Sequence, residues 1–157
     1  MVAGLACLVS LSSCTGRAAE DITKMLVAAD IRTGWWDAGI EDGKNKLVPS
    51  VILTLKNVSN ESLNLVQLNA VVRRVGETEE WGGAYLMVIG SGGLPPGAST
   101  KPIVLRSNLG YTGVEPRAQM LKHKQFVDTK VQLFLKHGGE QWVKLGEWPI
   151  TRELLAQ

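Results

Sequence analysis

The sequence contains few of the residues that form metal or catalytic sites, with only two cysteines and two histidines among 157 residues. His123 and His137 do not belong to an HxxxH pattern, and neither cysteine belongs to a CxxC pair. Zinc sites require sets of ligands at such spacings. We therefore predict no metal and no other cofactor.

An excess of one charge is also missing. Lys and Arg total 17 and Asp and Glu total 15, which gives a net charge of +2, and no run of basic residues concentrates that charge. A basic stripe is the electrostatic footprint of a nucleic-acid-binding protein. Its absence argues against nucleic acid as a partner.

Long hydrophobic runs are missing too, apart from one short segment at the N-terminus. Residues 2–11, VAGLACLVSL, carry no charge and are followed abruptly by polar residues. A helix of ten residues spans about 15 Å, half of the ~30 Å hydrocarbon core, so the segment is too short to cross a membrane. It has the profile of the apolar region of a signal peptide. A signal peptide begins with Lys or Arg, but here only Met1 precedes Val2, so we expect that this basic first region is truncated. We predict a signal peptide at 1–13.

Residues 11–14, LSSC, resemble the lipobox of bacterial lipoproteins, in which an aliphatic residue and two small residues precede a cysteine. The resemblance implies that the chain is cleaved before Cys14, that the Cys14 thiol is diacylated, and that residues 14–21 form a lipidated tether. Thr15 follows the cysteine where many inner-membrane lipoproteins carry Asp, which implies the outer membrane. Two acyl chains are enough for stable anchoring, whereas one is marginal.

The number of cysteines agrees with this interpretation. If residues 1–13 are removed, Cys7 is lost and the mature chain keeps one cysteine, which cannot form an internal disulfide. Lipidation explains that single thiol. Two alternatives stay open: an apolar N-terminal strand or helix with a chance cysteine, and a secreted or periplasmic protein whose signal peptide only resembles a lipobox.

Residues 22–157 are predicted to form one β-domain with one core. Three segments alternate side chains with a period of two, which is typical of half-buried strands. The core-facing sets are Val51, Leu53 and Leu55; Leu68, Ala70 and Val72; and Val131, Leu133 and Leu135. Further strands are predicted at 24–32, 84–89, 102–106 and 142–148.

Turns rich in Gly, Pro and Asn separate these segments. About seven short strands spaced in this way predict an all-β fold, an immunoglobulin-like antiparallel β-sandwich. Short helices are expected only at 116–122 and 151–156. Residues 51–75 and the LPPGAST segment at 94–100 resemble bacterial immunoglobulin-like domains of the FxLYD type, which implies binding rather than catalysis.

Catalytic patterns are not found. The GSGG segment at 90–93 lacks the glycine two residues before the serine that a nucleophile elbow needs, and it lacks the Lys of a phosphate-binding loop. We therefore predict no catalytic residues and no enzyme. The alternative is an envelope hydrolase, or an accessory domain of one, that acts on glycan or peptide and has a cleft lined by acidic residues or a Ser/His pair.

Five tryptophans are present, and two of them, Trp35 and Trp36, are adjacent and followed by Asp37. Neighbours in an extended segment face opposite sides, so only one of the two rings can enter the core. We predict that the other ring lies on the surface beside Asp37 and contacts a partner. Trp142 and Trp148 are expected on one face if their strand is regular. The favoured function is a lipid-anchored, non-catalytic envelope protein that binds or positions a protein or glycan partner.

Overall fold

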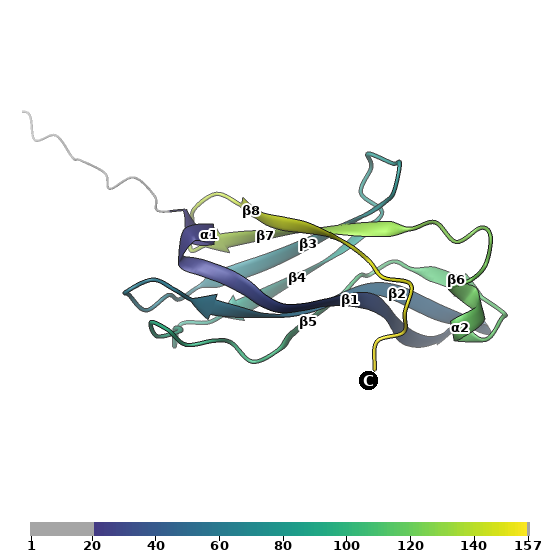
Figure 1. The fold of residues 1–157 in the computed structure, drawn as a ribbon, viewed down its shortest axis with the longest axis horizontal. Coiled ribbons are helices and arrows are strands. Elements are labelled where there is room, and N and C mark those ends of the chain that lie inside the picture. Colours follow the sequence, from purple (N-terminus) through teal and green to yellow (C-terminus); the bar gives the residue numbers. More distant parts are fainter. Residues whose placement is uncertain (1–20, 157) are drawn as a thin grey trace, which may run out of the picture.

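The structure is a computed structural model that describes residues 21–156. The predicted signal peptide, Cys14 and most of the predicted tether lie outside the described residues. Residues 21–156 form two four-stranded antiparallel sheets that lie face to face (Figure 1). The predicted all-β sandwich is therefore confirmed.

The first sheet, sheet I, is built around β2, which pairs with every other strand of the sheet. β1 lies on one side of β2, and β5 and β6 lie one after the other along its other side. The bounds are β1 (Leu26–Glu41), β2 (Lys44–Asn57), β5 (Ile103–Arg106) and β6 (Tyr111–Gly113).

The second sheet, sheet II, has the strand order β4-β3-β7-β8. Its strands are β3 (Val66–Arg74), β4 (Gly82–Ile89), β7 (Thr129–His137) and β8 (Val143–Pro149). The connection from β6 to β7 contains the helical turn α2 (Arg117–Met120), which lies within the helix predicted at 116–122. The two sheets thus place their edge strands in pairs, β1 near β8 and β4 near β5.

A two-residue turn joins β1 to β2. Asp42 and Gly43 have φ values of 50° and 75°, the left-handed values that both central positions of a tight hairpin need. Glycine adopts such a φ without steric cost, and Asp is one of the few other residues that tolerate it. The turn sets the register of the hairpin, with Glu41 opposite Lys44.

The core lies between the sheets, and the three predicted sets of alternating residues line it. Each of those side chains, from β2, β3 and β7, is at most 3% exposed. Full burial of one such aliphatic side chain stabilises the fold by about 1.5–3 kcal/mol. The period-two pattern therefore predicted the core face of these three strands correctly.

The strand predicted at 24–32 is wrong at both ends. Ile22–Met25 form a helical turn, α1, and β1 begins after it and continues to Glu41. Asp21 caps this turn, because its carboxylate accepts a hydrogen bond from the Thr23 backbone N–H at 3.0 Å. A side-chain acceptor at this position satisfies a donor that the first turn of a helix leaves unpaired.

The helix predicted at 151–156 is also wrong, because this segment runs beside β1. The Trp35 N–H donates to the Glu153 carbonyl at 2.8 Å, and the Leu155 N–H donates to the Trp35 carbonyl at 2.9 Å. In a helix, the N–H and C=O groups of residues 151–156 would bond to one another. Here the Leu155 N–H and the Glu153 carbonyl bond instead to the backbone of Trp35, on the outer edge of β1. The C-terminal segment therefore closes this edge of sheet I.

The last strand, β8, is irregular. A register shift against β7 leaves Leu145 as an extra residue, a β-bulge. Because of the extra residue, side chains before Leu145 point to the face opposite to the one that an unbroken alternation from Trp148 would give them. Trp148 consequently packs against the core, whereas Trp142 is 38% exposed on the outer face of sheet II. The expectation that these two rings share a face is therefore wrong.

Candidate functional site

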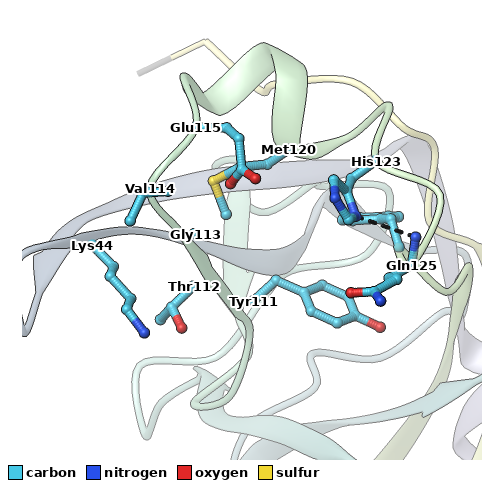
Figure 2. A pocket seen from close by; sticks show the side chains of 10 residues that line it. Lys44, Tyr111, Thr112, Gly113, Val114, Glu115, Met120, His123 and Gln125 are labelled. Carbon is cyan, nitrogen blue, oxygen red and sulfur yellow. Dashed lines mark hydrogen bonds between the residues drawn. The ribbon is translucent and has the colours of Figure 1, made fainter.

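A surface hollow of about 430 Å³ lies between β6 and the segment that follows α2 (Figure 2). Its lining residues are Lys44, Tyr111, Thr112, Gly113, Val114, Glu115, Met120, His123, Gln125 and Phe126. The His123 Nδ1 accepts a hydrogen bond from the Gln125 backbone N–H at 3.2 Å, which holds the imidazole against its own loop. Tyr111 and Phe126 also pack inside the fold, so part of this wall is structural.

Trp35 lies at the centre of an aromatic cluster beside this hollow. Its side chain is fully buried, and its ring centroid lies 4.6 Å from that of Phe126, 5.6 Å from that of Tyr111 and 6.5 Å from that of Trp81. Aromatic pairs at such separations stabilise a fold by about 0.5–1.5 kcal/mol beyond the area they bury. A fully buried ring cannot contact a partner, so Trp35 is the ring of the pair that enters the core, and of the three candidate residues it is not part of a partner surface.

Trp36 projects from the opposite face of β1, as the alternation of side chains predicts, and is partly exposed. The Arg106 guanidinium lies over its ring, with its central carbon 3.6 Å from the ring centroid. The two residues flank β2, because Trp36 is opposite Val48 and Arg106 is opposite Ser50. Both β2 residues are buried although they face away from the core. The Trp36–Arg106 pair therefore covers the outer face of sheet I.

Asp37 lies on the same face of β1 as Trp35, not beside Trp36 on the outer face. Its carboxylate pairs with the Arg117 guanidinium at the start of α2 and accepts a hydrogen bond from the Gly39 N–H at 2.9 Å. The hydrogen bond to Arg117 holds the pKa of Asp37 below its ordinary value. Asp37 thus attaches α2 to β1, and the three predicted residues do not form one surface.

The largest group of exposed apolar side chains on one strand lies on β4, which the sequence analysis predicted as a strand but not as a site. Tyr85, Leu86 and Met87 are 60%, 42% and 44% exposed. Trp142 reaches Tyr85 across the outer face of sheet II, with ring centroids 6.1 Å apart and planes at 74°. Leu86 points to the other face of the strand, because it lies opposite the core residue Leu68, so it is exposed at the open edge beside β5 and not on the outer face. We call Tyr85, Met87 and Trp142 the β4 surface. A sequence signal for it exists, because residues 81–100 contain no charged side chain.

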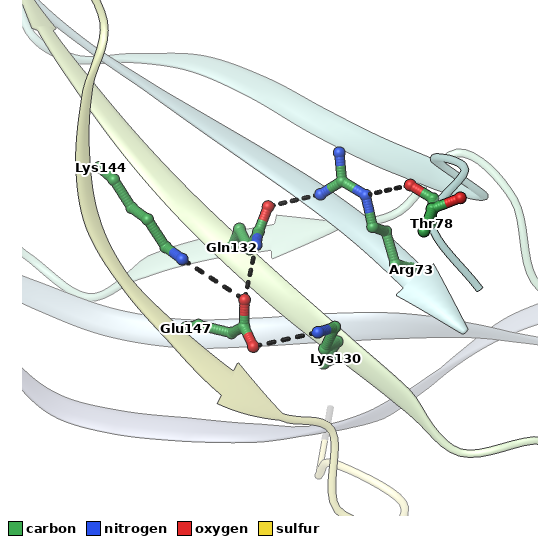
Figure 3. Close-up of polar contacts among 6 residues, drawn as sticks. All are labelled: Arg73, Thr78, Lys130, Gln132, Lys144 and Glu147. Carbon is green, nitrogen blue, oxygen red and sulfur yellow. Dashed lines mark hydrogen bonds and ion pairs between the residues drawn. The ribbon is translucent and has the colours of Figure 1, made fainter. Parts of the chain in front are cut away.

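The other end of the same outer face is polar (Figure 3). Glu147 accepts hydrogen bonds from Gln132 Nε2 at 2.6 Å and Lys130 Nζ at 3.2 Å, and Lys144 Nζ lies 3.5 Å away. The Gln132 side-chain oxygen in turn accepts from Arg73. These contacts, the bond from Gln132 first and then that from Lys130, lower the pKa of Glu147 to about 2. In this polar network the Glu147 carboxylate is paired with Lys130 and Lys144, and the Arg73 guanidinium is paired with the Gln132 side chain.

Residues 21–156 contain neither a metal-binding cluster nor a membrane-spanning helix. No three His, Cys, Asp or Glu side chains in this part of the chain are grouped so that they can hold a metal ion. Within the same residues, every helix is too short and too polar to cross a membrane. The candidate site is therefore the β4 surface, and the chemistry available there is apolar and aromatic contact.

Comparison with known proteins gives no family for this chain. No protein-family model matches it, and no curated protein matches it in sequence. Among solved structures, the chain is similar to the X-ray structure of Northeast Structural Genomics Consortium target SoR45, with 11% sequence identity and a TM-score of 0.46. The similarity covers 83% of this chain and 89% of that one.

Proposed function

We propose that this chain is a lipid-anchored, non-catalytic protein of the bacterial cell envelope that binds or positions a protein partner through the β4 surface. The observation that carries the proposal is the pair of exposed side chains Tyr85 and Met87 on the outer face of β4, with Trp142 next to Tyr85. Contiguous exposed apolar patches mark interaction sites on soluble domains. Tyr, Trp and Met are also enriched at the centres of protein interfaces.

The geometry of the two rings favours a protein over a glycan as the partner. The planes of Tyr85 and Trp142 meet at 74°, so the rings do not form one flat platform on which successive sugar rings can stack. Met87 adds flexible apolar contact area on the same face, and Met adapts easily to irregular apolar surfaces. A glycan partner is the second outcome that the experiment below can reveal.

The anchoring part of the proposal is supported by the LSSC sequence at 11–14 and by the single cysteine left after cleavage. We expect the full gene, expressed in a bacterial host, to incorporate labelled palmitate and to partition into detergent. The Cys14→Ser variant should lose both properties, because it lacks the thiol that accepts the lipid. Equal labelling of the two proteins contradicts the anchor.

The partner is tested by photo-crosslinking in intact envelopes. A photoreactive residue at position 85 should give a discrete crosslinked species, because Tyr85 lies in the proposed contact surface. The matched control places the same residue at Ile40, which is 71% exposed on β1 of the other sheet. Identical crosslinks at the two positions, or none at position 85, contradict partner binding through the β4 surface.

A further inference from the structure

The two sheets leave four edges, and three of them carry features that prevent strand pairing. The C-terminal segment 153–155 covers β1 at Trp35. The edge strand β8 contains the bulge at Leu145 and the charged residues Lys144 and Glu147. β5 and β6 have four and three residues. Bulges, charges, covering segments and shortness are the usual protection of sheet edges.

The fourth edge, β4, has none of this protection between Ala84 and Met87. The strand contains no charged residue and no proline, and its pairing with β3 is regular up to a register shift after Met87. Tyr85, Leu86 and Met87 are all exposed along this stretch. An uncharged, regular and exposed edge is a template for another strand.

Asn108 shows which backbone groups of β4 point outward. Its side-chain oxygen accepts a hydrogen bond from the Gly83 N–H at 2.9 Å, and its own N–H donates to the Gly83 carbonyl at 3.0 Å. The N–H and C=O groups of Gly83 therefore face away from β3. Since these groups alternate along a strand, those of Tyr85 and Met87 also face outward. Asn108 already makes at Gly83 the pair of bonds that an added strand would make at Tyr85 and Met87.

The space next to this edge has a distinct chemistry. A groove of about 520 Å³ between β4 and β5 is lined by apolar residues that include Leu86, Met87, Ile103 and Val104. Lys101 is the one charged residue in its lining, and no acidic residue contributes to it. An added strand therefore meets apolar side chains, the hydroxyl groups of Ser99 and Thr100, and a single positive charge.

We propose that the β4 edge binds an extended peptide segment of a partner protein as an additional strand of sheet II. The segment pairs with the N–H and C=O groups of Tyr85 and Met87, places apolar side chains in the groove, and carries an acidic residue that pairs with Lys101. This is recognition by strand addition, in which main-chain bonds give affinity and side-chain pockets give selectivity. It deepens, and rests on, the proposed binding of a protein partner.

A second copy of this chain fits the edge less well. Its own β4 brings no carboxylate, because Gly82–Ile89 contains no charged residue. Lys101 in the groove would therefore gain no acidic partner from that strand. Charge complementarity therefore favours a peptide that contains an acidic residue.

The experiment pans a library of random peptides of about ten residues, roughly 33 Å when extended, against the immobilised chain. The enriched peptides are then measured against the matched variants Met87→Pro and Met87→Ser. Both variants shorten the side chain, but only proline removes the outward N–H, and it leaves the bonds to β3 in place. We expect Met87→Pro to weaken binding about tenfold or more and Met87→Ser by less than about threefold.

Lys101→Glu is a second test that does not alter β4. It should reverse the preference of the panned peptides from acidic to basic residues. Thermal melts of all variants show whether each remains folded, and if Met87→Pro does not fold, Lys101→Glu decides.

Three results overturn strand addition by a peptide. These are equal binding by Met87→Pro and Met87→Ser, an unchanged charge preference in Lys101→Glu, and failure to enrich any peptide. A dimer of the chain that Met87→Pro dissociates assigns the edge to a second copy instead. Peptides that bind equally to both Met87 variants leave the proposed function intact, whereas absence of crosslinks at position 85 removes it.

Discussion

The two long sides of the sandwich differ in how their edges end. On the side of β1 and β8, Thr33 Oγ1 donates to the Pro149 carbonyl at 2.8 Å and accepts from the Thr151 N–H at 3.2 Å, which ties the C-terminal segment to both sheets. On the side of β4 and β5, Asn108 covers Gly83 alone. One side is closed by the chain itself, and the other keeps an open strand edge.

The closed side contributes to the stability of the fold, whereas the open side leaves apolar surface uncovered. The closed side uses residues 151–156, which contribute no strand to either sheet but satisfy the edge of β1 at Trp35. The open side exposes apolar side chains at a cost in solubility that natural sheets usually avoid. An exposed edge of this kind is expected where a partner covers it.

The largest expected effect is on the closed side. Trp35→Ala should lower the free energy of unfolding by about 3–5 kcal/mol, because it removes the buried centre of the aromatic cluster. Trp36→Ala is the matched neighbour and should cost less than half as much, because its ring is partly exposed and its contact with Arg106 is worth about 0.5–1 kcal/mol. Urea unfolding of both variants measures the difference. Equal losses would contradict the opposite roles of the two rings.

The C-terminal cover should give the next largest effect. Leu155 is buried and lies against Gly34, where an added Cβ would come within 2.8 Å of the Leu155 side chain. Leu155→Ala should therefore cost about 2 kcal/mol. The exposed neighbour Leu154 is the control, and Leu154→Ala should stay within about 0.5 kcal/mol of the parent. Thermal melts that show the same shift for both variants would disprove the covering role.

A smaller effect is expected on the open side. Asn108→Ala should cost about 1 kcal/mol, because it removes the acceptor of the Gly83 N–H. It frees only the Gly83 N–H, because the bond from the backbone N–H of residue 108 to the Gly83 carbonyl remains, and the added donor should modestly strengthen binding of panned peptides. Asn60→Ala, at an exposed loop position, serves as the control. If Asn108→Ala leaves peptide binding unchanged, Asn108 does not limit the edge.

The smallest effect concerns the polar network on sheet II. The folded-state pKa of Glu147 is about 2, below its ordinary value of 4.5. Its stabilising contribution is therefore complete above about pH 4.5 and is lost as the pH falls towards 2. Gln132→Ala should raise this pKa, because the Gln132 hydrogen bond is its largest cause. A carboxyl-resolved NMR titration measures both proteins, and an unchanged Glu147 pKa would remove Gln132 from this role.

Much of the fold was predictable because burial of one strand face leaves a period-two pattern. The three strongest strands and their core residues follow from it, as on β7 with Val131, Leu133 and Leu135. The length of β1 and the extended segment 151–156 were not predictable in this way. Both depend on pairing between residues far apart in the sequence, such as Trp35 with Glu153.

The candidate site was predicted less well than the fold. Because Trp35 and Trp36 are neighbours in the sequence, their rings were expected on opposite faces of a strand. The sequence could not show that Asp37 pairs with Arg117, which is 80 residues further along the chain. The open backbone edge at Tyr85 depends on β4 being an edge strand, which the order of strands in the sheet decides. The absence of charge in residues 81–100 was the available signal, and its meaning follows only from the sheet order.

Amide hydrogen exchange at single-residue resolution tests the open edge most directly. The N–H groups of Tyr85 and Met87 should exchange close to the rate of an unstructured chain, because they have no partner strand. The Leu86 N–H, which faces β3, and the Trp35 N–H, which the C-terminal segment covers, should be strongly protected. Protection of Tyr85 and Met87 equal to that of Leu86 would show that β4 is already closed and would contradict the account.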